Sequence, residues 1–206
     1  VLEREIMNSL YPDTAYGVES GGAPDFIPDL TYEDFLDFHK QYYHPANSYI
    51  FLYGDADMEE RLQWMDREYL GKYDKISVSS FPGVQEAFLE CKDIEKNYPI
   101  TEDESEEDNT YLSVNMVVEN CLDRELYLAF QIVDYALVDA QGTPLKQSLL
   151  DAGIGTEVYS VFENGIYQPY YSVIAKNTNP SEKARFLEIT DNVLRNVVKN
   201  GFDKNA

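Results

Sequence analysis

The chain has 206 residues, which is enough for one large domain or two small ones with a buried core. Apolar residues make up 44% of the sequence and aromatic residues 14%, a globular composition in which tyrosine is the commonest aromatic residue. The formal net charge of −22 argues against partners such as nucleic acids and anionic membrane surfaces, because both would repel the protein. No apolar run approaches the ~20 residues of a membrane-spanning helix.

The two cysteines, Cys91 and Cys121, are far apart in the sequence and form neither a CxxC motif nor a disulfide framework. We therefore expect reduced thiols and a cytoplasmic location. The N-terminal residues lack the pattern of a signal peptide. The chain begins at Val1 rather than at a methionine, so we expect it to be a piece of a longer protein, called the parent below.

The first thirty residues are predicted to be mostly irregular. Residues 2–10 are expected to be the end of a helix, and the stretch from there to residue 30 carries three Pro and three Gly, which is typical of a surface loop. Thr31 is a candidate N-cap for a helix with apolar residues at helical spacing. Pro45 disfavours helical backbone in the residue before it, so this helix should end near Tyr43.

Residues 47–54, "NSYIFLYG", are rich in aromatic and β-branched residues and are predicted to form a buried strand. Asp57 should cap the next helix, which Gly71 should stop. The connection that follows is weakly patterned, and we place a domain boundary in it. The predicted division is residues 1–86, the end of a first domain, and residues 87–206, most of a second.

An acidic run of six Asp and Glu residues lies between Glu102 and Asp108. A calcium loop of the EF type would need alternating Asp residues and a glycine at the turn, and the run has neither. We interpret it as a solvated loop. Residues 110–119 then alternate between apolar and polar or aromatic side chains, which predicts a half-buried strand.

Two helices are predicted next. Asp123 should cap a long amphipathic helix. Thr143 stands at the N-cap position of the second helix and Pro144 at its first residue, and Gly153 should mark its end.

Two strands, 157–163 and 167–176, are expected around the turn residues Asn164 and Gly165. Pro169 within the second strand indicates an edge strand or a bulge. A last helix should run from Pro180 to Gly201. Strands joined by hairpins with helices on one face make an α+β, two-layer sandwich with a mainly antiparallel sheet.

His39 and His44 are the only histidines, and they raise the question of a metal site. Two zinc ligands on one helix stand at i and i+4, with a glutamate nearby in metalloproteases. Here the spacing is five, so the two side chains would point about 140° apart at ~100° per residue. We therefore interpret both histidines as structural, and expect no metal or other cofactor to bind this chain.

The order of the pieces is more specific than any one of them. The stretch "LYPDTAYGVESGGAPDFIPDLTYEDFLDFHKQYYHPANSYIFLYGDAD", residues 10–57, resembles the insulinase/pitrilysin-like zinc metallopeptidases, in particular their presequence-protease-like branch. There a "YP…SGG.P..IP.LTYE.F..FH..YYHP.N" signature precedes "YGD". Ala23 departs from the acid expected after Ser-Gly-Gly. Residues 142–163, "GTPLKQSLLDAGIGTEVYSVFE", resemble the "G…SPL…L…G.G" region of the family's second domain.

The resemblance implies that the parent is a zinc endopeptidase that degrades unstructured peptides in an enclosed chamber. Its zinc would come from an HxxEH motif and a further glutamate, which this chain lacks. The chain would be structural and would form part of the chamber wall, with the parent's other domains and peptide substrates, basic ones included, as partners. The alternative is a piece of a zinc-free scaffold subunit of the same fold.

The glycine-rich turn at residues 142–145 lacks the lysine and the spacing of nucleotide-binding loops. It is either a loop followed by a helix cap or a peptide-contacting turn, because a glycine admits a close backbone and free N–H groups open the next helix. By resemblance, this region and the strand after it face the chamber. The predicted peptide-contacting residues are Gly142, Thr143, Pro144, Leu145, Glu157 and Tyr159.

Overall fold

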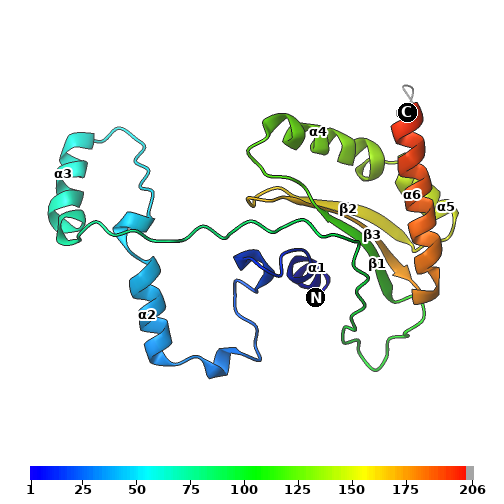
Figure 1. Cartoon of the computed structure of the whole chain (residues 1–206), viewed down its shortest axis with the longest axis horizontal. Helices are drawn as coiled ribbons and strands as arrows, with labels where there is room; N and C mark the ends of the chain where they lie inside the picture. The colour runs from blue at the N-terminus through cyan, green and yellow to red at the C-terminus, as the bar shows by residue number, and fades with distance from the viewer. Residues whose placement is uncertain (203–206) are drawn as a thin grey trace. The chain divides into compact units, whose positions relative to one another are not determined.

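The structure is a computed structural model that describes residues 1–202 (Figure 1). It contains two compact units, which are described separately: residues 18–83, and residues 1–17 together with the described chain from residue 84 onward. Residues 1–17 thus pack with the second half of the chain. The predicted division into domains 1–86 and 87–206 concerns the parent and stays a prediction.

The larger unit is built on a three-stranded antiparallel sheet. Its strands are β1 (Thr110–Val117), β2 (Glu157–Glu163) and β3 (Tyr170–Thr178), in the order β1-β3-β2. The expectation that Pro169 marks an edge strand or a bulge is wrong, because β3 is central and starts just after it. Pro169 has no N–H to lose, and its carbonyl accepts a hydrogen bond from the Val118 N–H at 2.7 Å.

Helices cover one face of this sheet, as predicted, and the fold is the expected α+β sandwich (Figure 1). They are α4 (Arg124–Asp134), α5 (Pro144–Asp151) and α6 (Lys183–Asn200), and a π-helical turn, Tyr135–Asp139, extends α4. Asp123 caps α4 as predicted, since its carboxylate accepts hydrogen bonds from two N–H groups of the first turn. Within the described residues, no helix is both long and apolar enough to cross a bilayer.

The core between the helices and the sheet is apolar and closely packed. Its fully buried side chains come from all three helical segments and from the alternate strand positions that face them. They include Val138, Leu145, Leu149, Val158, Ala175 and Phe186.

The opposite face of the sheet carries a smaller apolar cluster under α1 (Leu2–Leu10). This helix was expected, but the prediction placed all helices on one face. Tyr11, at the end of α1, is fully buried, and its hydroxyl donates a hydrogen bond to the carbonyl of Gln168 at 2.6 Å. Burial against the sheet, then the neighbouring Tyr170, raises the pKa of Tyr11. The tyrosine therefore anchors α1 to the sheet.

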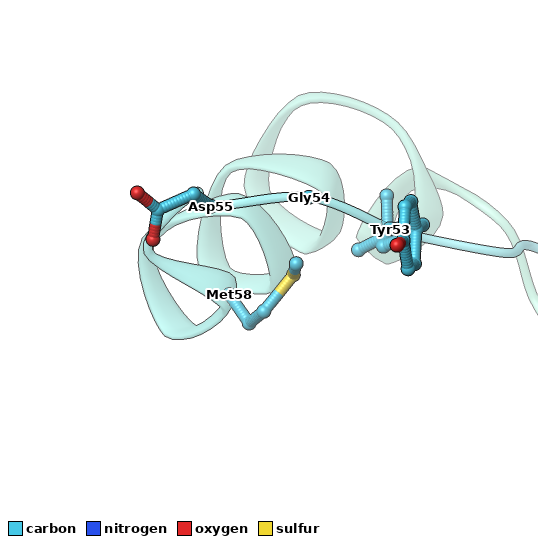
Figure 2. Close-up of a pocket in the computed structure, with 5 residues that line it drawn as sticks. Tyr53, Gly54, Asp55 and Met58 are labelled. Atoms are coloured by element: carbon cyan, nitrogen blue, oxygen red, sulfur yellow. The ribbon is translucent and has the colours of Figure 1, made fainter.

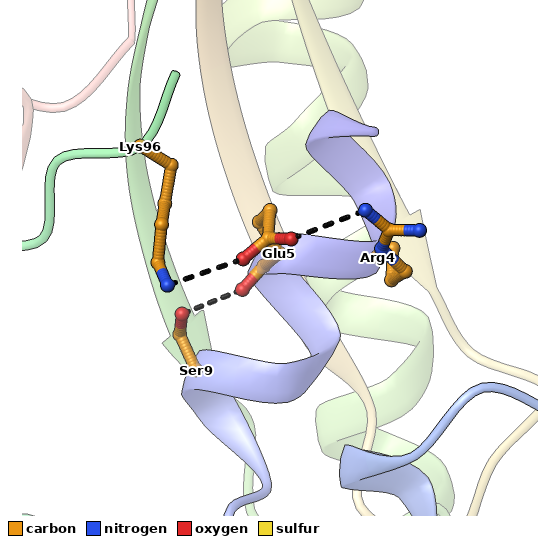
Figure 3. Close-up of polar contacts among 4 residues, drawn as sticks. All are labelled: Arg4, Glu5, Ser9 and Lys96. Carbon is orange, nitrogen blue, oxygen red and sulfur yellow. Dashed lines mark hydrogen bonds and ion pairs between the residues drawn. The ribbon is translucent and has the colours of Figure 1, made fainter. Parts of the chain in front are cut away.

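Ion pairs at the solvent side of α1 add little to this anchor (Figure 3). The Glu5 carboxylate lies 3.5 Å from the Arg4 guanidinium and 3.8 Å from the Lys96 ammonium, and all three side chains reach solvent. Ser9 donates to the Glu5 carbonyl at 2.5 Å, which is a bond within the helix. Because exposed pairs contribute about 0–1 kcal/mol, the apolar cluster is the main cause of the packing.

A buried pair of glutamines ties the irregular connection before β1 to the base of the sheet. The Gln85 N–H donates to the Gln168 side-chain oxygen at 2.6 Å, and the Gln168 amide donates back to the Gln85 carbonyl at 3.1 Å. The acidic run at residues 102–108 is exposed throughout, as predicted. Asn179 holds its end through two hydrogen bonds with Asp108, at 2.9 and 2.6 Å.

The smaller unit, residues 18–83, contains α2 (Tyr32–Tyr42) and α3 (Met58–Glu68). Thr31 and Asp57 cap these helices as predicted, and Thr31 forms a full capping box with Asp34. Short 3₁₀ turns occur in the chain at Ala15–Gly17, Ile27–Asp29, Pro45–Asn47, Leu70–Lys72 and Pro180–Glu182.

The strand predicted at residues 47–54 is extended but unpaired, so it is not a strand within the described residues. Local preference produces the extended backbone, whereas a strand also needs a neighbour to complete its ladder. Gly71 does not end α3 either, because the helix stops at Glu68 and Gly71 lies in the following turn.

We expect Leu149→Ala to lower the free energy of unfolding of the larger unit by about 2–5 kcal/mol, because it leaves a cavity in a fully buried part of the core. Leu128→Ala on α4 is the matched control, since this leucine is 56% exposed and its loss should cost little. Urea unfolding followed by far-ultraviolet circular dichroism measures both. The single Trp64 belongs to the other unit, so its fluorescence should not report the change. Equal losses in the two variants would contradict the core described here.

Candidate functional site

The turn before α5 is the first part of the predicted peptide-contacting surface. Gly142 is exposed, has a φ of +73°, and has open space where a side chain would start. Thr143 is buried, and its hydroxyl donates to the carbonyls of Val138 and Ala140 at 3.1 and 3.0 Å. It stands at the N-cap of α5 as predicted, but it accepts no hydrogen bond from that helix. The hydroxyl instead closes the preceding π-helical turn.

The next two residues lie mostly inside the fold. Leu145 has no exposed surface and belongs to the core between the helices and the sheet. Pro144 is half-buried, and its carbonyl accepts a hydrogen bond from the Ser148 hydroxyl at 2.7 Å. At this turn, therefore, a ligand could reach the backbone of Gly142 and one edge of the Pro144 ring, but not the side chains of Thr143 or Leu145.

The strand β2 presents the other predicted residues on the opposite face of the sheet. Tyr159 belongs to the apolar cluster under α1, whereas its neighbour Val158 faces the helical core. Glu157 is exposed, and its carboxylate lies 3.5 Å from the Lys176 ammonium. Burial, followed by the nearby Tyr111 and Glu157, raises the pKa of Tyr159.

The six predicted residues therefore do not form one site. The sheet separates Leu145, which packs against its helical face, from Tyr159, which packs against its α1 face. The alternation of side chains along a strand places Glu157 on the same face as Tyr159. Whether any of these residues contacts peptide stays a prediction.

A glycine that the sequence analysis passed over fixes the start of β2. A side chain at Gly155 would place its first carbon 2.5 Å from the carbonyl oxygen of Lys176, and the φ of Gly155 is +72°. The next residue, Thr156, donates to the same carbonyl at 3.0 Å. The signal was visible as the second glycine of "GIG" just before the strand. Only glycine allows this close approach at positive φ.

The two histidines have separate structural positions in the smaller unit. The ring of His39 stacks on Tyr43, with centroids 4.7 Å apart. His44 accepts a hydrogen bond from the Ala46 N–H on its Nδ1 at 3.1 Å and meets Tyr73 edge to face. The Nδ1 that caps this turn is not free to bind a metal.

The residues present do not fit a zinc site. Structural and catalytic zinc sites use three or four convergent ligands. In residues 1–202, no three His, Cys, Asp or Glu side chains lie together in a way that could hold a metal ion. Cys91 and Cys121 are free thiols and belong to no such group.

Comparison with known proteins identifies the family. The family model described as "Peptidase M16 inactive domain" matches residues 29–206. Protein HypA of Clostridium perfringens is 41% identical over 204 residues, which cover 99% of this chain and 21% of that protein.

Presequence proteases are further relatives. Presequence protease 1, chloroplastic/mitochondrial, of Arabidopsis thaliana is 33% identical over 210 residues, covering 100% of this chain and 19% of the relative. The mitochondrial presequence protease of Xenopus laevis is 26% identical over 206 residues, covering 98% and 20%. The chain thus spans about a fifth of the length of these relatives. It belongs to the Peptidase M16 inactive-domain family, in a presequence-protease-like form, as the resemblance of residues 10–57 and 142–163 indicated.

Proposed function

We propose that this chain is a non-catalytic segment of a zinc-dependent endopeptidase, which degrades unstructured peptides inside an enclosed chamber, and that the segment forms part of the chamber wall. The observation that carries the proposal is the family itself. The matching family model describes an inactive domain, and relatives that are similar over the whole chain are named as proteases.

The absence of converging ligands supports the non-catalytic role. A catalytic zinc needs three protein ligands and an open position for water. Here the ring nitrogen of His44 closes a turn and His39 stacks on a tyrosine, so neither side chain is available without local unfolding. The zinc of the parent would therefore be held by residues outside this chain. When bound, it would polarise the scissile carbonyl and activate a water molecule.

The charge of the chain supports a preference of the parent for basic peptides. The net charge of −22 includes an exposed acidic run at residues 102–108 and the exposed Glu157 of β2. Exposed carboxylates act over a Debye length of ~8–10 Å at physiological to 0.1 M salt. They would concentrate basic peptides near the wall and repel acidic ones.

The rival proposal is that the parent is a zinc-free scaffold subunit. The words "inactive domain" fit both, since an inactive domain occurs beside a catalytic one or in a protein without catalysis. An HxxEH motif in the parent sequence favours the peptidase, and its absence favours the scaffold.

The isolated chain should bind no stoichiometric zinc and cleave no fluorogenic peptide. Metal analysis of the purified chain after incubation with zinc and buffer exchange tests this. His44→Ala should remove only the turn cap, at a cost of about 1 kcal/mol of stability by analogy with other caps. His39→Ala is the control of equal chemistry. Tightly bound zinc that disappears in His44→Ala but remains in His39→Ala would overturn the non-catalytic role.

In the full-length parent, Gly142→Asn should raise KM for a basic peptide several-fold without changing the thermal midpoint. Asparagine tolerates positive φ better than most residues and adds a side chain at the one open position of the turn. Gly142→Val changes the same surface but strains the backbone, so it separates strain from blocked contact.

The matching controls concern Thr143 and salt. Thr143→Ala should act through stability, and Thr143→Ser should restore it, because the hydroxyl bonds only to carbonyls of its own chain. KM for a basic peptide should rise with salt and that for an acidic peptide should not. Unchanged kinetics in Gly142→Asn, together with no salt dependence for either peptide, would remove the chamber-wall role.

A further inference from the structure

The segment Ser48–Tyr53 is extended and exposes its whole backbone. No backbone N–H or carbonyl of residues 49–54 is hydrogen-bonded to another backbone group in the described chain. An extended segment with a full row of unpaired donors and acceptors is a template for pairing with further strands.

Both faces of this segment are apolar. Tyr49, Phe51 and Tyr53 point one way along an extended chain and are 106%, 87% and 93% exposed. Ile50 and Leu52 point the other way and are also exposed. An edge strand at a surface would alternate between apolar and polar residues, whereas a continuous apolar run is typical of a strand covered on both faces.

The rest of the smaller unit lacks a core in the same way. No residue from 18 to 83 is buried, whereas every buried residue of the described chain belongs to the larger unit. On α2 the side chains of Phe35 and Phe38 are exposed, and on α3 those of Leu62 and Trp64. Amphipathic helices are stabilised mainly by packing of their apolar face, so these two helices need an additional layer.

The end of the segment shows where that layer would lie (Figure 2). Tyr53, Gly54, Asp55 and Met58 line an open hollow of about 420 Å³ together with Leu52. No polar side chain in it is buried, so the hollow is not built to hold a polar ligand. Its apolar walls fit side chains from a neighbouring element of the fold.

We propose that Ser48–Tyr53 is an interior strand of a sheet whose other strands, and the layer covering it, come from the rest of the parent polypeptide. The length of the relatives supports this occupant. The 204 aligned residues make up 21% of the length of HypA, so about four-fifths of a chain of that kind lies outside this segment. The proposal rests on membership of a longer chain and not on catalysis, so its failure would leave the proposed function standing.

A second copy of this chain is the less suitable occupant. Pairing of two copies through Ser48–Tyr53 would give each segment one neighbour and leave the outer edge of both unpaired. A two-stranded ribbon without a covering layer is marginally stable in water. An interior strand needs two neighbours and a cover on each face, which a single polypeptide of several domains can supply.

Hydrogen exchange in the full-length parent and in the isolated chain tests the proposal. Amides of residues 49–54 should exchange at least about 100-fold more slowly in the parent, since paired core strands open only in global unfolding. Residues of β3 serve as the internal control, because they are paired in both forms. Equally fast exchange of residues 49–54 in the parent would overturn the proposal. So would slow exchange in the isolated chain that depends on concentration and accompanies a dimer in light scattering, because that result identifies a second copy.

A single substitution in two contexts gives an independent readout. Phe51→Asp should leave the thermal midpoint of the isolated chain unchanged, because the ring is already exposed there. In the parent it should lower the midpoint by at least about 5 °C or abolish soluble expression, since a charge would enter a covered sheet. An unchanged midpoint and yield in the parent would count against an interior strand.

Discussion

Burial of the central strand β3 is the constraint on which the larger unit depends. β3 pairs with β1 on one side and β2 on the other, and six consecutive residues from Tyr170 to Ala175 are buried. Such a run is possible only because one face meets the helical core and the other meets α1. The turn at Gly155 and the hydrogen bonds to Pro169 and Gln168 then fix where the strand begins and ends.

The smaller unit shows the same chemistry without its complement. Its helices are capped correctly and its apolar segment is extended, yet nothing in residues 18–83 is buried. Local interactions are thus sufficient for helix ends and backbone direction, whereas a core requires residues from distant parts of a chain. A family member that spans about a fifth of the length of its relatives would be expected to contain such an incomplete unit.

The same distinction explains what could be predicted from the sequence. Caps at Thr31, Asp57 and Asp123 involve residues two or three positions apart, and all three predictions are confirmed. The strand order, the central position of β3 and the packing of α1 depend on long-range contacts, and periodicity carries no information on them. Pro169 was read as a mark of an edge strand for this reason, because the pattern alone could not place the strand's first residue.

The candidate site illustrates the limit more sharply. Gly142 and Pro144 signalled a turn and a helix start, and both are present. The sequence could not reveal that the Thr143 hydroxyl faces back to Val138, since the π-helical turn has no simple signature. It also could not reveal that a sheet lies between Leu145 and Tyr159. The peptide-contacting surface, if the turn is part of it, is therefore smaller than the six residues predicted.

The central claim is that this chain is an inactive part of a peptidase that has its zinc elsewhere. Zinc content and chelator-sensitive cleavage of an unstructured peptide, measured together on the purified full-length parent, test it most directly. The account predicts stoichiometric zinc, loss of cleavage on chelation and recovery on adding zinc back. A parent that is folded and complete but holds no zinc and cleaves no peptide would contradict the account and identify a scaffold protein instead.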